Sequence, residues 1–261
     1  MRREPERIEM RQIVSDPRNV ETAYALQYEN LAKKIVSLVR TRNGTLVEVG
    51  CGEGQLTIHL AKLLPRHRFS VVDAFTGAYS GALNRLSRAL SGVNLKNRVK
   101  VHRTDYLDWL REEFSDKYVG VISSEFLPEI DSYELSMFVS ECYRVVRPGG
   151  LTVHSFLSPI ARNRRQKLLI EADSNPKWTK TPPKEWFSPE PALVLSKLRR
   201  VGFRDLRIAR LESNLIIKSS AARNLLHSWD VRSRFWKTHK VELASKGLEV
   251  PDWVIVSGRK P

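Results

Sequence analysis

The stretch VEVGCGEGQL, residues 47–56, constrains the fold of this chain more than any other part of its sequence. An apolar run ends there, three glycines follow at alternate positions, and an apolar pattern with helical spacing begins directly afterwards. A glycine-rich turn between a strand and a helix lets a ligand approach the backbone closely, and it directs the helix N-terminus towards that ligand. The pattern therefore predicts an α/β domain with a ligand site at this turn.

Strand and helix patterns alternate along the rest of the chain, with short connections between them. Such alternation favours a doubly wound, mostly parallel sheet with helices on both faces. The motif RPGG, residues 147–150, is expected to end a helix. Strands are expected at residues 45–50, 67–75, 99–105, 117–126, 151–156, 203–211 and 252–260. Helices are expected at residues 20–41, 55–64, 79–92, 132–146, 191–202 and 219–247.

The domain organisation expected from this pattern is a single domain with elaborations. Residues 1–43 form an N-terminal helical segment, residues 44–156 the cofactor-binding core, and residues 157–261 an insertion followed by the last strands. Within the insertion, residues 161–190 are polar, rich in proline and carry two tryptophans. Long polar segments of this kind often serve as active-site lids, and we expect this one to control access to the site.

Composition narrows the class of protein. No apolar run approaches the ~20 residues that a membrane span needs, and the N-terminus is charged, so neither a span nor a signal peptide is expected. The two cysteines, Cys51 and Cys142, lack C-x-x-C spacing, which argues against a metal site and favours a reducing, cytoplasmic compartment. Cys51 is expected to be a small buried spacer within the glycine turn.

The chain is strongly basic, with a net charge of +15. Residues 1–156 contain 22 basic and 19 acidic residues, whereas residues 157–261 contain 22 basic and 10 acidic residues. This excess suggests an anionic partner, such as RNA or an acidic small molecule. The alternative is that the charge serves only solubility and stability.

Acidic residues accompany the glycine turn and indicate what kind of ligand it holds. Glu48 precedes the first glycine by two residues, where it would disfavour a pyrophosphate. Gln55 stands where a dinucleotide fingerprint has its last glycine, and Asp73 ends the next strand, where an acid can accept both hydroxyls of a ribose. The pattern favours a cationic cofactor without phosphate over a nucleotide-linked oxidoreductase. In the simpler alternative, Asp73 and Asp105 cap helices and Glu48 is a surface acid.

The combined pattern resembles class I S-adenosylmethionine-dependent methyltransferases. It consists of E-x-G-x-G-x-G, an acid ending the second strand, Asp105 ending the third, and RPGG before the fifth. The resemblance implies a Rossmann-like sheet of seven strands with the last one antiparallel, and S-adenosylmethionine as cofactor. It implies that the following residues bind that cofactor: Glu48, Gly50, Gly52, Gly54, Asp73, Asp105, Tyr106 and, at the end of the fourth strand, Ser123 and Ser124.

The methyl acceptor is left open by the sequence, as is the oligomeric state. Glu125 and Glu134 resemble the paired glutamates that hold a guanidinium in protein arginine methyltransferases, although acids at a helix N-terminus are equally ordinary. His154 is a candidate general base, with a buried structural histidine as the alternative. The layout after residue 156 is similar to that of small-molecule methyltransferases.

Nucleic acid is a further acceptor class that the sequence leaves open. The N/D-P-P-F/Y tetrapeptide used for methylating base amino groups is absent. Arginines and tryptophans in the last third could form a surface for stacking and phosphate contacts, or the tryptophans could belong to the core. A nucleic-acid-binding module that merely retains the fold is therefore the non-enzymatic alternative.

Overall fold

A computed structural model describes residues 12–179 and 189–261 and divides the chain into two compact units. The large unit comprises Ala25–Leu157, Trp186–Leu211 and Trp253–Pro261. The small unit comprises Met1–Tyr24, Ser158–Glu185 and Glu212–Asp252. The sequence pattern predicted one domain, whereas the elaborations on the sheet gather into a unit of their own.

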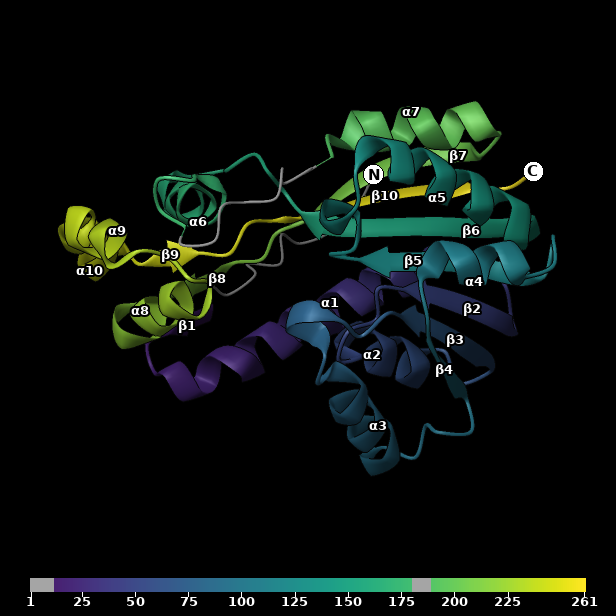
Figure 1. The fold of residues 1–261 in the computed structure, drawn as a ribbon, viewed down its shortest axis with the longest axis horizontal. Coiled ribbons are helices and arrows are strands. Elements are labelled where there is room, and N and C mark those ends of the chain that lie inside the picture. Colours follow the sequence, from purple (N-terminus) through teal and green to yellow (C-terminus); the bar gives the residue numbers. More distant parts are fainter. Residues whose placement is uncertain (1–11, 180–188) are drawn as a thin grey trace, which may run out of the picture. The chain divides into compact units, whose positions relative to one another are not determined.

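A seven-stranded sheet forms the centre of the large unit (Figure 1). Every strand pair is parallel except the two pairs made by β10, which runs antiparallel to both of its neighbours. This arrangement confirms the expected doubly wound sheet and its antiparallel last strand. In spatial order the strands are β4 (Val99–Arg103), β3 (His67–Asp73), β2 (Gly44–Val49), β5 (Tyr118–Ser124), β6 (Val146–Leu157), β10 (Trp253–Arg259) and β7 (Arg204–Leu211).

Helices cover both faces of this sheet, and their apolar stripes form two separate core clusters. Because strands between two helical layers are buried on both sides, all seven residues of β5 are buried. In the described part of the chain, no helix is long and apolar enough to cross a bilayer. One face carries α1 (Val20–Val36), α2 (Gln55–Leu63) and α3 (Ala82–Gly92); the other carries α4 (Tyr106–Glu112), α5 (Ser132–Val145) and α7 (Pro191–Val201).

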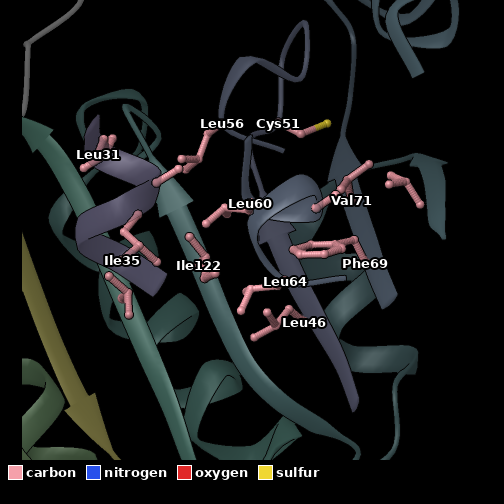
Figure 2. Close-up of a cluster of buried hydrophobic side chains, with 14 of the residues drawn as sticks. Leu31, Ile35, Leu46, Cys51, Leu56, Leu60, Leu64, Phe69, Val71 and Ile122 are labelled. Carbon is pink, nitrogen blue, oxygen red and sulfur yellow. The ribbon is translucent and has the colours of Figure 1, made fainter. Parts of the chain in front are cut away.

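The core on the α2 side of the sheet holds the helix that follows the glycine turn. Figure 2 shows Leu60 and Leu64 among Leu46 and Phe69, with Cys51 at the upper end of the same cluster. Leu46 and Leu60 are fully buried, and burying a leucine contributes roughly 1.5–3 kcal/mol relative to leaving it exposed. Cys51 is buried as expected, and burial raises the pKa of its thiol, so it behaves as an apolar spacer.

The RPGG motif lies differently from its prediction. Helix α5 ends at Val145, and β6 begins at Val146, so residues 147–150 open a strand instead of ending a helix. Gly149 has a φ of +76°, and a Cβ on Gly150 would lie 2.9 Å from the carbonyl oxygen of Val119. Gly149 is therefore favoured by its positive φ, and Gly150 by the close approach of β5 and β6.

The small unit contains a three-stranded sheet and four α-helices, most of which the sequence pattern did not predict. The predicted helix over residues 219–247 is three shorter helices, because Trp229 and His239 leave the helical conformation. The strands of the small unit, in order, are β1 (Gln12–Val14), β8 (Leu215–Ile217) and β9 (Leu248–Glu249), and its described helices are α6 (Arg164–Ser174), α8 (Ser219–Ser228), α9 (Ser233–Thr238) and α10 (Lys240–Lys246).

Three-residue 3₁₀ turns occur in both units. The small unit contains η1 (Pro17–Asn19), and the large unit contains η2 (Gly77–Tyr79) and η3 (Leu127–Glu129).

A buried carboxylate connects α6 to the short strands of the small unit. Glu249 is almost fully buried and pairs with Arg162 at 3.0 Å and Arg165 at 2.8 Å. Asn163 and Gln166 also donate to it, at 3.0 and 3.3 Å. Breaking the pairing of a buried charge is strongly destabilising, because the charges that remain have neither water nor a partner.

We expect Glu249→Gln to lower the free energy of unfolding by about 1.5–3 kcal/mol, because it leaves Arg165 without a carboxylate partner, whereas Arg162 retains Glu212 and Asp252. The matched control is Glu242→Gln, which removes exposed ion pairs with Arg164 and Lys246 and should cost less than about 1 kcal/mol. Urea denaturation measures both values, and equal effects of the two variants would contradict a structural role for the buried pairing.

Candidate cofactor-binding site

The glycine turn joins β2 to α2 in a conformation that favours glycine at all three positions. The φ angles of Gly50, Gly52 and Gly54 are +73°, +48° and +81°. Gly50 donates its N–H to the carbonyl of Val72 at 2.9 Å, and Gly54 donates to the carbonyl of Cys51 at 2.8 Å. Since L side chains rarely adopt such angles, the spacing of glycines in the sequence follows from the path of the backbone.

The three glycines differ in the space beside them. A Cβ on Gly54 would lie 2.2 Å from the Leu86 side chain, and one on Gly50 would lie 2.8 Å from the Phe126 ring. At Gly52 the nearest atoms belong to Tyr79, at 3.7 Å, which is an ordinary contact. Gly50 and Gly54 therefore serve packing as well as backbone conformation, whereas a side chain at Gly52 would meet only the ordinary contact with Tyr79.

Asp73 holds the turn in place from the end of β3. One carboxylate oxygen accepts the N–H of Gly52 at 2.9 Å, and the other accepts the N–H of Phe75 at 2.7 Å. A carboxylate can accept about four hydrogen bonds, so each oxygen retains a further acceptor position. The capping alternative for Asp73 is wrong, because its carboxylate joins two loops.

Glu48 is buried, contrary to the alternative of a surface acid. It lies on β2, and its Oε2 accepts the hydroxyl of Thr57 on α2 at 2.6 Å. Burial raises the pKa of Glu48 to about 8, partly offset by the Thr57 hydrogen bond and reinforced by the charge of Asp73. A nearby cation would favour the ionised form of this carboxyl, whereas a nearby pyrophosphate would disfavour it.

Asp105 and Tyr106 lie at the end of β4. Asp105 caps α4 as the alternative expected: its Oδ1 accepts the N–H groups of Leu107 and Asp108 at 2.8 and 3.2 Å. Both bonds use one oxygen, so Oδ2 remains available to a ligand. The Tyr106 ring packs edge-on against Phe126, with ring centroids 4.7 Å apart.

Polar atoms at this edge of the sheet are buried without partners. They are the side-chain oxygens of Gln55, Tyr106 and Ser124, which follow or end β2, β4 and β5. Carboxyl ends of parallel strands meet at one edge, where ligands of open α/β sheets bind. Buried polar atoms normally have partners, so these atoms, together with the acids, fit a polar, cationic cofactor. In the described residues, no group of three histidines, cysteines or acids is placed to hold a metal ion.

Glu125 and Glu134 already accept backbone N–H groups. Glu125 follows β5 with a φ of +55°, and its carboxylate accepts the N–H of Leu157 at 2.6 Å. Glu134 lies in the first turn of α5, where it accepts the N–H of Asp131 at 3.0 Å in a capping box. The structure thus gives each acid a contact with the backbone, and their pairing around a guanidinium stays a prediction.

His154 lies inside the sheet instead of facing a cleft. Its Nδ1 is 2.9 Å from the Ser123 hydroxyl and its Nε2 is 2.8 Å from the Thr152 hydroxyl, and the residue is fully buried. Burial lowers the pKa of His154 to about 3. This environment is that of a neutral core histidine, and it offers an acceptor molecule no path to the ring. Ser123 is occupied by the same contact.

Three residues of the site escaped the sequence analysis: Thr57, Tyr79 and Phe126. Thr57 satisfies the buried Glu48, and it stands nine residues further along, in the first turn after the glycines. Tyr79 and Phe126 lie beside Gly52 and Gly50. Phe126 directly follows the strand-ending residues SSE, a position from which a side chain can reach the neighbouring turn, whereas nothing in the sequence marks Tyr79.

Comparisons with known proteins agree with this geometry. Residues 46–150 match a family model described as a methyltransferase domain. The fold is similar to a S-adenosylmethionine-dependent methyltransferase from Archaeoglobus fulgidus, with a TM-score of 0.56, 16% identity, and coverage of 90% of this chain and 94% of that one. It is also similar to phosphoethanolamine N-methyltransferase 2 from Haemonchus contortus, with a TM-score of 0.61, 12% identity, and coverage of 92% and 57% respectively. No curated protein sequence matches the chain.

The raised pKa of Glu48 predicts a specific pH dependence of stability. The stability associated with its protonated form is complete below pH 4.5 and is lost as pH rises towards about 8. We expect Glu48→Gln to remove roughly 3 kcal/mol of the decrease in unfolding free energy between pH 5 and pH 8, measured without ligand.

Glu53→Gln is the control for this experiment, because Glu53 lies on the same turn but is exposed and paired with Arg85. It removes a carboxylate from the same turn without touching the buried one, and should change the free energy of unfolding by less than about 1 kcal/mol. Parallel pH profiles for wild type and Glu48→Gln would show that Glu48 is ionised throughout.

Proposed function

We propose that this chain is a class I methyltransferase that transfers a methyl group from S-adenosylmethionine to a nitrogen or oxygen nucleophile. The proposed family is supported by the fold and by the match of residues 46–150 to a methyltransferase-domain model. The observation that carries the proposal is the glycine turn held by the Asp73 carboxylate, with the buried carboxyl group of Glu48 on the strand that leads into it.

The residues of the turn suit this cofactor. Asp73 retains acceptor positions for two ribose hydroxyls, and Asp105 Oδ2 is available to an exocyclic amino group. Glu48 lies beneath the turn, where its negative form would be favoured by the sulfonium and ammonium charges. When bound, the cofactor supplies an electrophilic methyl group on a positively charged sulfur.

Catalysis in this proposal depends on positioning and on exclusion of water. Methyl transfer from a sulfonium is an in-line displacement, for which alignment of the reacting atoms provides much of the rate enhancement. Ser124 ends β5 and Glu125 follows it, at the edge of the sheet where the donor methyl group is expected. The buried His154 does not take the role of base, so an acceptor with its own available lone pair is favoured.

The acceptor belongs to one of three classes: a small molecule, RNA or a protein side chain. Glu125 and Glu134 each accept one backbone N–H and retain acceptor positions, so an arginine side chain stays among the candidate acceptors. A small-molecule acceptor agrees with the phosphoethanolamine N-methyltransferase whose fold is similar. The lid expected at residues 161–190 remains part of the proposal; residues 180–188 lie outside the described residues, and residues 164–174 form α6.

Gly52→Ala should weaken S-adenosylmethionine binding at least tenfold, since it places a methyl group and a strained φ on the turn that faces the ligand. Gly149→Ala is the matched control. Gly149 has a φ of +76°, has open space for a Cβ and lies near the start of β6. Isothermal titration calorimetry measures both. The proposal fails if wild type binds no S-adenosylmethionine, or if both variants bind as wild type does.

Incubation of the protein with methyl-labelled cofactor in a cell extract should transfer label to one acceptor fraction. We expect the label in the small-molecule fraction, and label in RNA or protein would reassign the acceptor while confirming methyl transfer. Asp73→Ala should abolish the labelling and serves as the control. Cofactor binding without label in any fraction would favour a binding module that retains the fold.

A further inference from the structure

A pocket of the large unit lies at the opposite end of the strands from the glycine turn. Three arginines from separate segments line it: Arg40 from the loop after α1, Arg207 from β7 and Arg259 from β10. Asp205 and Ser257 complete its polar lining. The cavity volume is about 40 Å³, and the cavity is open to solvent. We call this group of residues the arginine pocket.

Strand register places the arginine pocket at the amino ends of the parallel strands. Arg259 pairs with Leu151, near the start of β6, and Leu151 in turn pairs with Gly120 in β5. The glycine turn follows the carboxyl end of β2, at the opposite edge of the sheet. The arginine pocket is therefore separate from the cofactor site.

The charges in the arginine pocket are not balanced within the protein. Arg259 donates hydrogen bonds to the carbonyl oxygens of Leu38 and Gly149, neither of which carries a charge. Within residues 12–179 and 189–261, Arg40 and Arg207 form no side-chain hydrogen bond or ion pair, and Asp205 forms no ion pair. Desolvation and the charges of Arg40 and Arg207 lower the pKa of Arg259, while Asp205 opposes this.

We propose that the arginine pocket binds a phosphate group, either free or in the backbone of a polynucleotide. Guanidinium groups offer paired N–H donors whose spacing matches two phosphate oxygens. Three such groups with one carboxylate leave a lining charge of about +2, which a bound phosphate would neutralise. The hydroxyl of Ser257 adds a neutral donor within the same lining.

Protection of the sheet edge is the simpler explanation for arginines on β7. Charged side chains on an edge strand prevent it from pairing with another chain, and this accounts for Arg204 and Arg210, which are exposed and do not line the pocket. Edge protection does not account for Arg40, which comes from a loop, or for Arg259, whose strand lies inside the sheet. A bound anion would offset the mutual repulsion of the three guanidinium groups, which Asp205 offsets only in part.

The test compares Arg207→Gln with Arg204→Gln, which removes the same charge from the same strand outside the pocket. Inorganic phosphate is titrated calorimetrically at low salt, and a fluorescein-labelled single-stranded RNA 12-mer is titrated by anisotropy. We expect Arg207→Gln to weaken binding at least tenfold and Arg204→Gln to change it less than twofold. Loss of phosphate binding would identify a free anion as ligand, and loss of RNA binding alone would identify a polynucleotide backbone.

Three results would overturn the proposal. They are no binding of either probe to wild type, binding that Arg207→Gln leaves intact, and equal loss in the two variants, which would indicate general attraction to a basic surface. Circular dichroism checks that both variants are folded. Because the pocket is remote from the glycine turn, both should bind S-adenosylmethionine as wild type does, which keeps this test independent of the proposed function.

Discussion

The carboxylate of Asp73 is the contact on which the organisation of the site depends. It joins the end of β3 to the glycine turn after β2 through the N–H of Gly52, and it fixes its own following loop through the N–H of Phe75. Hydrogen bonds to a charged group contribute about 1.5–3 kcal/mol each, enough to hold backbone angles that the chain would otherwise leave. Phe75, with a φ of +52°, is fully buried below the same loop.

The two edges of the sheet in the large unit carry side chains of opposite charge. At the carboxyl edge, Asp73 and Asp105 create a negative environment in a chain whose net charge is +15, and a bound cation would favour ionisation of Glu48 beside them. At the amino edge, Arg40, Arg207 and Arg259 create a positive one. A cationic cofactor and an anionic ligand would thus be attracted to opposite ends of the same strands.

Much of the large unit could be predicted from the sequence, because its signals are local. The central strand β5 is a nearly continuous apolar segment, the edge strand β7 alternates apolar with charged residues, and the glycine turn requires glycine for backbone reasons. The ends of β3 and β4 could be placed because an acid closes each apolar run. The RPGG motif was placed wrongly, since glycines that end a helix and glycines that permit close strand approach look alike in sequence.

The small unit could not be predicted, because contacts distant in the sequence form it. Strand β1 has only three residues and pairs with β8 about 200 residues later, and Glu249 pairs with Arg162 from a distant part of the sequence.

Contacts between distant residues also limit what the sequence shows of the candidate site. It could not show that His154 is enclosed by Ser123 and Thr152, or that Glu125 accepts the N–H of Leu157. Candidate catalytic residues were thus less predictable than cofactor-binding ones.

The most direct test of the central claim is a crystal structure of the protein with S-adenosylhomocysteine. The account predicts the ribose hydroxyls within hydrogen-bonding distance of the Asp73 carboxylate, the backbone of Gly52 beside the ligand, and Asp105 at the adenine amino group. A ligand bound elsewhere, or one bound at the glycine turn without contact to Asp73, would contradict it.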